Sequence, residues 1–168
     1  MDAAQYNKMT AGLRKRPGAV RALQVANKVL TVVGYVAYPA LLVVLAVGAQ
    51  WPQLLRCVVV PAAAFVALSA FRKVYNAPRP YEALDIQPLI AKDTTGKSFP
   101  SRHAFSMFMI AVSWFVASPV VGAVLCAAGV FMACVRVVGG VHFPRDVAAG
   151  AAFAVAVGVV GYMLLPLP

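Results

Sequence analysis

The sequence predicts an all-α fold, a polytopic bundle of about five membrane-spanning helices with an N-terminal amphipathic helix. Two observations lead to this prediction. Hydrophobic residues make up 62% of the chain, well above the roughly half that is usual for soluble domains. They also gather into long runs, and a helix needs about 20 apolar residues to cross a bilayer core of ~30 Å. Five stretches meet or nearly meet that length: 29–49, 54–71, 104–118, 120–135 and 147–165.

The first 28 residues are polar and basic, and apolar residues alternate irregularly with Lys and Arg. This pattern is typical of an amphipathic helix lying on the membrane surface, so 1–28 is expected to form an interfacial segment. The apolar run that follows is long enough to span a bilayer, which argues against a cleavable signal peptide.

The spans 104–118 and 120–135 are short and meet at Ser118-Pro119, which predicts a tight helical hairpin. The longest connection is 72–102, which holds four prolines and three of the five acidic residues. Long polar loops in compact domains are usually functional, so we expect this loop to contribute to an active site. Without an internal repeat or linker, residues 1–168 are expected to form a single domain.

The charge pattern also points to the membrane. Fifteen Lys and Arg face five Asp and Glu, which gives a net charge of +10. These charges fall between the apolar runs, as expected of loops that meet anionic headgroups or an anionic substrate; nucleic acid is therefore not expected as a partner. The cysteines, Cys57, Cys126 and Cys134, lie in apolar runs without ligand spacing, which predicts neither a disulfide framework nor a metal site.

Candidate chemistry occurs first at the end of the second span. If the helix persists toward Pro78, Arg72 and Arg79 lie on one face, within about 20° of each other. Two converging guanidiniums are suited to a doubly charged phosphate, and Lys73 offers a neighbouring cation. The alternative is that these basic residues only set the membrane topology.

A second candidate segment leads into the third span. Ser98 is placed to cap a helix and Pro100 to lie in its first turn, so the free N–H groups would form an anion site. Ser101 adds a hydroxyl donor, Arg102 a charge and His103 a proton donor near neutral pH. An interfacial histidine that is merely solvated remains the alternative.

The third candidate segment, 136–146, joins the fourth and fifth spans. A diglycine allows a sharp turn after the fourth helix, and Pro144 marks the start of the fifth. Asp146 would then lie in the first helical turn, where it can accept the ring N–H of His142 and leave the other nitrogen free to attack. Alternatively, Asp146 only complements the helix dipole.

Five spans would place all three segments on one membrane side. Both histidines and five arginines fall there, and only Arg56 is sorted to the opposite side. The five are Arg72, Arg79, Arg102, Arg136 and Arg145.

At these residues the sequence resembles the type 2 phosphatidic acid phosphatase superfamily, which includes the vanadium haloperoxidases, and within it the bacterial membrane lipid phosphatases. The family signature is Lys-x6-Arg-Pro, then Pro-Ser-Gly-His, then Ser-Arg-x5-His-x3-Asp. The corresponding stretches here are Arg72-x6-Arg79-Pro80, Pro100-Ser101-Arg102-His103 and Val135-Arg136-x5-His142-x3-Asp146. Their order and spacing match over about half of the chain.

The chain departs from the signature at three positions. Arg72 replaces the leading lysine, with Lys73 one residue further on; Arg102 replaces the glycine of the second motif; and Val135 replaces a serine. Arg102 therefore either adds a phosphate contact or points away.

The resemblance implies a role for each matching residue. His142 would attack phosphorus and form a phosphohistidine, Asp146 would orient it, and His103 would protonate the leaving oxygen and then activate water. The phosphate would be held by Arg72 or Lys73, together with Arg79, Ser101, Arg102 and Arg136. The guanidiniums would supply the positive charge, so neither a metal nor another cofactor is expected.

The expected function is hydrolysis of a lipid phosphate monoester or diphosphate, such as phosphatidate, phosphatidylglycerophosphate or undecaprenyl diphosphate. The protein would be a multi-pass protein of the bacterial cytoplasmic membrane. Two alternatives remain: a lipid phosphotransferase that uses the same site, and a non-enzymatic protein that binds anionic lipid. The basic N-terminus favours a cytoplasmic site, whereas many family members act on the outer face, so the side is left open.

Overall fold

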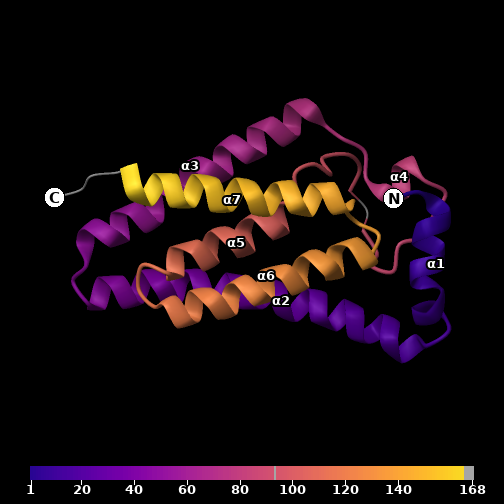
Figure 1. Ribbon diagram of the computed structural model, residues 1–168, viewed down its shortest axis with the longest axis horizontal. Helices are drawn as coiled ribbons and strands as arrows, with labels where there is room; N and C mark the ends of the chain where they lie inside the picture. Colours follow the sequence, from indigo (N-terminus) through magenta and orange to yellow (C-terminus); the bar gives the residue numbers. More distant parts are fainter. Residues whose placement is uncertain (93, 165–168) are drawn as a thin grey trace.

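The apolar stretches form helices that run along a common axis (Figure 1). The computed structural model describes residues 1–92 and 94–164, and within these residues it contains helices and loops but no strand. The helices are α1 (Ala3–Arg14), α2 (Pro17–Val47), α3 (Trp51–Tyr75), α4 (Pro80–Ala83), α5 (Arg102–Trp114), α6 (Pro119–Val138) and α7 (Pro144–Leu164).

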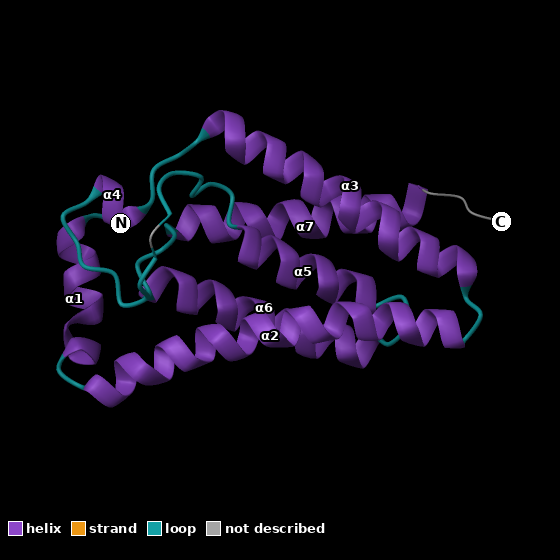
Figure 2. Cartoon of the chain, turned by 180° about the vertical axis from the view of Figure 1, so that it is seen from behind, coloured by secondary structure: helices purple, strands orange, loops and turns teal. Residues whose placement is uncertain are grey.

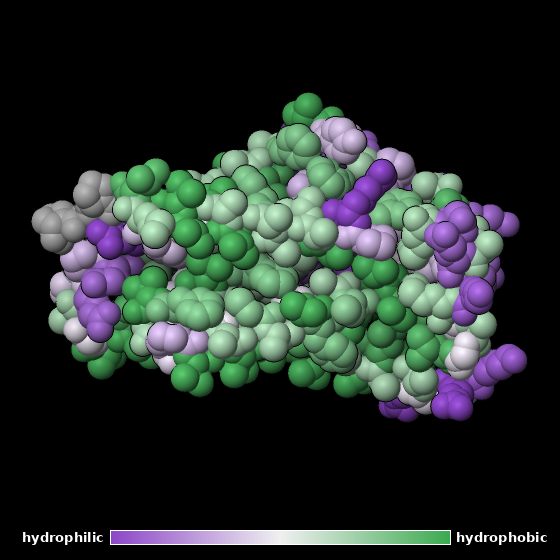
Figure 3. Space-filling model, in the orientation of Figure 1, coloured by the Kyte–Doolittle hydropathy of each residue, from purple (hydrophilic) through white to green (hydrophobic). Residues whose placement is uncertain are grey.

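Four segments of the described chain are long and apolar enough to cross a membrane: Pro17–Val47, Trp51–Ala83, Pro119–Val138 and Pro144–Leu164. Their outward faces carry exposed valines, leucines and aromatic residues, which form the broad hydrophobic belt seen in Figure 3. Polar residues gather at the two ends of the long axis. The protein is therefore a multi-pass membrane protein, and the predicted polytopic helical bundle is confirmed.

The third predicted span, 104–118, corresponds to α5, which has 13 residues and is about 20 Å long. It lies inside the bundle (Figure 2) and contributes to all three hydrophobic clusters of the core. Met107 packs with α2 and α6, Trp114 packs with α2, α3 and α6, and Phe105 packs with α3 and α7. The helix ends at Trp114, and the hairpin to α6 follows, with the Ser118 hydroxyl accepting the N–H of Val121 at 3.4 Å.

The N-terminal segment is divided, unlike the continuous interfacial stretch 1–28 that the sequence suggested. Asp2 and Gln5 form a reciprocal cap at the start of α1, and α2 begins at Pro17, whose missing N–H and fixed φ suit a first helical turn. Residues 17–28 therefore belong to a spanning helix. The short α1 lies across one end of the bundle (Figure 1), with Tyr6 fully buried and its hydroxyl donating to the carbonyl of Val138 at 3.2 Å.

Two predicted helix boundaries are wrong. Helix α3 ends at Tyr75 because Asn76 adopts a left-handed conformation, so Arg79 lies in the following loop and does not share a helix face with Arg72. Helix α5 has Ser101 at its N-cap position, without a side-chain capping hydrogen bond, three residues later than the predicted cap Ser98. The Ser98 side chain is engaged in a tertiary contact instead, which is described below.

Candidate active site

Three segments that are distant in the sequence meet at one end of the bundle: the end of α3 with its loop, the start of α5, and the turn between α6 and α7 (Figure 1). The backbone N–H of Ser101 donates to the carbonyl of Asp146 at 2.8 Å, which ties α5 to α7. Gly150 allows this approach, since a Cβ there would lie 2.5 Å from the carbonyl oxygen of Ser101. The turn itself uses Gly140, whose φ of 75° favours glycine.

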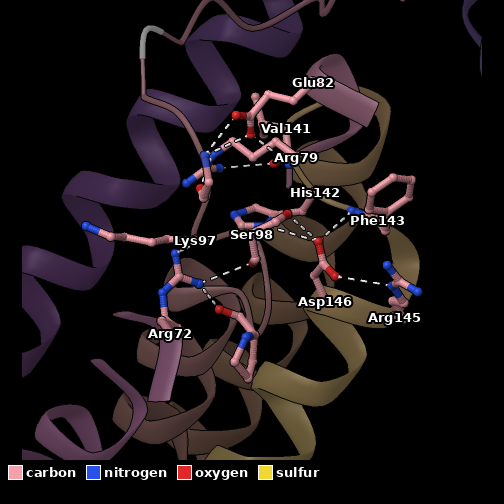
Figure 4. Close-up of polar contacts among 12 residues, drawn as sticks. Arg72, Arg79, Glu82, Lys97, Ser98, Val141, His142, Phe143, Arg145 and Asp146 are labelled. Atoms are coloured by element: carbon pink, nitrogen blue, oxygen red, sulfur yellow. Dashed lines mark hydrogen bonds and ion pairs between the residues drawn. The ribbon is translucent and has the colours of Figure 1, made fainter. Parts of the chain in front are cut away.

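His142 is held on one side by a serine and a carboxylate (Figure 4). Its Nδ1 lies 3.5 Å from Oδ2 of Asp146 and 3.3 Å from Oγ of Ser98. The same carboxylate oxygen accepts the Ser98 hydroxyl at 2.5 Å and the N–H of Phe143 at 2.9 Å. All three side chains are almost fully buried. With Nδ1 facing this pair, Nε2 is the ring nitrogen left for a substrate.

The surroundings of His142 keep its ring neutral. Burial lowers its pKa to about 4; the hydrogen bond with Asp146 opposes this shift, and the charges of Arg136 and Arg79 reinforce it. At neutral pH the ring therefore carries a free lone pair, as a nucleophile requires.

His103 lies in the first turn of α5 and is partly buried. Burial lowers its pKa to about 3, and the positive charges of Arg136 and Lys92 add to the effect. His142 and Arg79 also act on His103, so the two imidazoles lie within electrostatic reach of each other. A bound anion would offset these charges and so raise the proton affinity of His103.

Two buried guanidiniums hold the loop that precedes α5. Arg72 donates to three backbone carbonyls: Ser98 at 3.2 Å, Lys97 and Pro100. Arg79 donates from Nε to Gly96 and from Nη1 to Val141, both at 3.1 Å. Lys73, by contrast, is exposed. Of the two candidates for the leading position of the first motif, Arg72 is thus the one directed into the site.

Glu82 organises the same loop, a role the sequence analysis did not assign. Its carboxylate accepts the N–H of Arg79 at 2.8 Å and the N–H of Gly96 at 2.9 and 3.0 Å. Gly96 has a φ of 62°, and a Cβ there would lie 2.3 Å from Oδ1 of Asn76, so glycine is required. The three-residue spacing from Arg79 to Glu82, behind a proline, is the capping pattern from which this contact was detectable.

Arg136 and Ser101 provide buried donors that are available to a ligand. Arg136 is 2% exposed and donates from Nη1 to Oδ1 of Asn27 at 3.1 Å. Its Nε and Nη2, and Oγ of Ser101, have no hydrogen-bond partner within the described residues. A buried donor without a partner costs about 1–3 kcal/mol. Phosphate oxygens would satisfy all three, because they accept several charge-assisted hydrogen bonds at once.

Two other arginines lie at the edge of the site. Arg102 is exposed, and its guanidinium carbon lies 5.2 Å from the centre of the Phe65 ring on α3. Its side chain therefore extends along α3. Arg145 is 71% exposed, and its Nε lies 3.8 Å from Oδ1 of Asp146.

Across the described chain, no three His, Cys, Asp or Glu side chains are grouped as a metal site; the positive charge here comes from Arg and Lys.

A helical bundle with a buried histidine–aspartate pair and a cluster of cations at one end defines a multi-pass membrane protein with a candidate anion site. Sequence comparison then identifies the family. The chain belongs to the PAP2 superfamily, whose sequence profile matches residues 53–166. No curated protein sequence matches significantly.

Two solved structures share the fold. The first is LpxE from Aquifex aeolicus, with a TM-score of 0.74 and 22% identity over 96% of this chain and 94% of that one. The second is described as the first transmembrane PAP2-type phosphatidylglycerolphosphate phosphatase from Bacillus subtilis. It has a TM-score of 0.57 and 19% identity over 95% and 92% of the two chains. The likeness therefore extends over nearly the whole chain.

Proposed function

We propose that the protein is a lipid phosphatase that works through a phosphohistidine at His142. The observation that carries the proposal is the set of unpaired buried donors on Arg136 and Ser101 beside a neutral, oriented histidine. Family membership agrees with it, as do the two structural neighbours, one of which is described as a phosphatidylglycerolphosphate phosphatase.

In the first step, Nε2 of His142 attacks phosphorus in line, so an N–P bond forms while the bond to the lipid oxygen breaks. Asp146 and Ser98 hold the ring and stabilise the positive charge that develops on it. The donors of Arg136 and Ser101 bind the phosphoryl oxygens, where negative charge must be stabilised. His103 gives a proton to the leaving lipid alcohol.

In the second step, His103 takes a proton from water, which attacks the phosphohistidine and releases inorganic phosphate. The proton gained here replaces the one given in the first step, so the enzyme returns to its starting state. Arginines supply the positive charge for both steps, and we therefore expect activity without added metal.

Aromatic side chains near the site favour a lipid substrate. Phe71 and Tyr75 on α3 stack at 5.4 Å, and Phe99 lies 5.7 Å from Tyr75. Such aromatic clusters are typical of the headgroup level of a bilayer. A phosphate presented there, with its tail in the hydrocarbon, is available as phosphatidate, phosphatidylglycerophosphate or undecaprenyl diphosphate. We therefore propose the bacterial cytoplasmic membrane as the location of the protein.

The test is phosphate release by the purified full chain in detergent with EDTA, offering these three lipids. We expect turnover of at least one, loss of turnover in His142→Ala, and an acid-labile phosphoenzyme in the unmodified protein but not in the variant. Full activity of His142→Ala would exclude this mechanism. Lipid binding without phosphate release by the unmodified protein would favour the non-enzymatic alternative.

A further inference from the structure

Lys92 lies in the loop between α4 and α5, and its backbone neighbourhood is fixed against the α6–α7 turn. The N–H of Ile90 donates to the carbonyl of Gly139 at 3.1 Å, and the carbonyl of Leu89 accepts the side-chain amide of Gln24 at 2.9 Å. The contact with Gly139 is close, since a Cβ there would lie 2.4 Å from Cδ1 of Ile90. The chain is thus anchored beside the third motif two residues before Lys92.

From this anchor, the Lys92 side chain joins the cations of the site. It is partly buried, and burial together with the charges of Arg136, Arg79 and Arg72 lowers its pKa to about 8. Its own charge acts on His103. The ammonium is therefore coupled electrostatically to charged or titratable groups from four elements: α3 with Arg72, the segment before α4 with Arg79, α5 with His103 and α6 with Arg136.

No hydrogen bond or ion pair joins the Lys92 ammonium to another described residue, and the three guanidiniums of Arg136, Arg79 and Arg72 act on it electrostatically. Such clustering of like charges is unfavourable by itself. A dianion bound among these groups would reverse the sign of the interaction. The cluster of cations is therefore suited to binding an anion, and without one it does not stabilise the fold.

The leading position of the first motif does not offer a comparable group. The guanidinium of Arg72 donates through Nη1 and Nη2 to three carbonyls of the loop before α5, and only its Nε has no hydrogen-bond partner within the described residues. Both terminal nitrogens therefore hold that loop. A lysine ammonium, in contrast, is a compact charge with three rotatable donors and binds phosphate without a fixed geometry.

We propose that Lys92 supplies the ammonium that binds the substrate phosphate beside His103, while Arg72 positions the loop that carries Ser101. This assignment rests on the proposed phosphatase function. It also couples binding to proton transfer, because neutralising the Lys92 charge with phosphate removes part of the field that keeps His103 unprotonated.

The test compares Lys92→Ala and Lys92→Arg with Lys8→Ala, which removes an exposed lysine from α1 at the same end of the molecule. We expect Lys92→Ala to lower kcat/KM and to raise the inhibition constant of inorganic phosphate by about 10- to 100-fold, as for a lost hydrogen bond to a charged group. Lys8→Ala should change neither. Active protein with unchanged kcat/KM and phosphate inhibition in Lys92→Ala would overturn the assignment.

The pH profile separates substrate binding from a purely structural role. Lys92 is charged below its pKa and neutral above it, so kcat/KM of the unmodified protein should fall as pH rises through about 8. In Lys92→Arg the cation persists, and the alkaline limb should move to higher pH. Tyr81→Phe, which removes a phenol that acts electrostatically on Arg79 and Arg136, should leave the limb in place. A limb that does not respond to Lys92→Arg would contradict the proposal.

Thermal stabilisation by phosphate distinguishes failure of the proposed phosphatase function from failure of the proposed phosphate-binding role of Lys92. If the unmodified protein is stabilised by phosphate but hydrolyses no lipid, the proposed function fails, and loss of stabilisation in Lys92→Ala still supports the binding role. If phosphate has no effect on the unmodified protein, the binding role fails as well.

Discussion

Ser98 lies between the proposed nucleophile and the carboxylate that orients it, because its hydroxyl contacts both Nδ1 of His142 and Oδ2 of Asp146. Ser98→Ala should lower kcat by about 10- to 100-fold, the effect of one hydrogen bond to a charged group, with little change in KM. Steady-state kinetics checks this. Ser113→Ala, which removes another buried hydroxyl far from the site, is the control and should retain kcat. An equal loss in both variants would mean that the effect is not specific to the site.

The two histidines also make the stability of the fold depend on pH. Their pKa values are about 3 and 4 in the folded protein and near 6.5 in an unfolded chain. Below pH 6.5 the unfolded state therefore binds protons that the folded state does not, and stability falls as pH falls. Between pH 7 and 5, His142 alone should contribute a loss of about 2 kcal/mol, and His103 should add to it.

Thermal unfolding of the detergent-solubilised protein, followed by tryptophan fluorescence from pH 5 to 7, measures this dependence. The midpoint should rise with pH, and His142→Gln should show a shallower rise because its side chain does not titrate. Phosphate should also reduce the slope. A midpoint that is flat or falls between pH 5 and 7 would show that these rings are not held neutral.

At this scale the sequence predicted the residues that motif spacing defines and missed those that depend on tertiary contacts. His142, Asp146, His103, Ser101 and Arg136 do meet at one end of the bundle. The contact of Asn27 with Arg136 joins residues 109 positions apart, and Lys92 lies in no motif. Neither was visible as a local pattern.

At the scale of helices, hydropathy located the long apolar segments, but helix ends were less predictable. The shared face of Arg72 and Arg79 assumed a helix continuing to Pro78, whereas Asn76 turns the chain and Arg79 reaches the site from a loop. Serine is a favoured helix N-cap residue, but the hydroxyl of Ser98 donates to Asp146 on α7. In both cases a tertiary contact, or a single left-handed residue, outweighed local propensity.

Next to the site, the packing of α5 on α7 depends on Gly150. A Cβ at Gly150 would meet backbone atoms, 2.5 Å from the Ser101 carbonyl oxygen and 3.3 Å from the N–H nitrogens of Ser101 and Phe105. Gly150→Ala should therefore push the start of α5 away from Asp146. We expect a destabilisation of about 1–3 kcal/mol, as for an overpacked core, and a loss of activity.

Gly18→Ala is the matched comparison, because a Cβ at Gly18 meets nothing within 4 Å. That change lies in the first turn of α2 and should be neutral or slightly stabilising, since alanine favours the helix. Thermal midpoints and phosphate release measured on both variants decide the matter. A stable and active Gly150→Ala protein would show that α5 and α7 can separate without cost.

For the whole molecule, the sequence predicted the class of fold because the spacing of apolar runs reflects the thickness of the bilayer. It was less informative for α5, which is shorter than an ordinary span and buried among the others. Its position depends on packing against α6 and α7 rather than on lipid. The sequence likewise did not show that the N-terminal segment is divided between α1, which docks on the bundle, and α2, which spans the membrane. Both helices carry basic residues.

The arrangement of the ends predicts the side on which the site lies. The N-terminus and the site lie at one end of the bundle and α7 ends at the other (Figure 1). The guanidinium of Arg14 also donates to the carbonyl of Gln87, which ties α1 to the site loop. Apart from the site cations, the N-terminal segment carries six basic residues: Lys8, Arg14, Lys15, Arg16, Arg21 and Lys28. By the positive-inside rule, this end should face the cytoplasm.

Cysteine labelling tests this topology in a variant in which Cys57, Cys126 and Cys134 are replaced by alanine. Single cysteines at Asn7, Gln87 and Gln50 report on α1, the site loop and the α2–α3 turn, and all three positions are exposed. An impermeant maleimide should label Asn7→Cys and Gln87→Cys only in inverted vesicles, and Gln50→Cys in intact cells. Labelling of Gln87→Cys in intact cells would show that the orientation is the reverse of the one predicted. Labelling of Gln50→Cys and Gln87→Cys from the same side would contradict the bundle topology. Because the phosphate must approach from the headgroup level of the leaflet that the site faces, the same experiment determines which leaflet supplies the substrate.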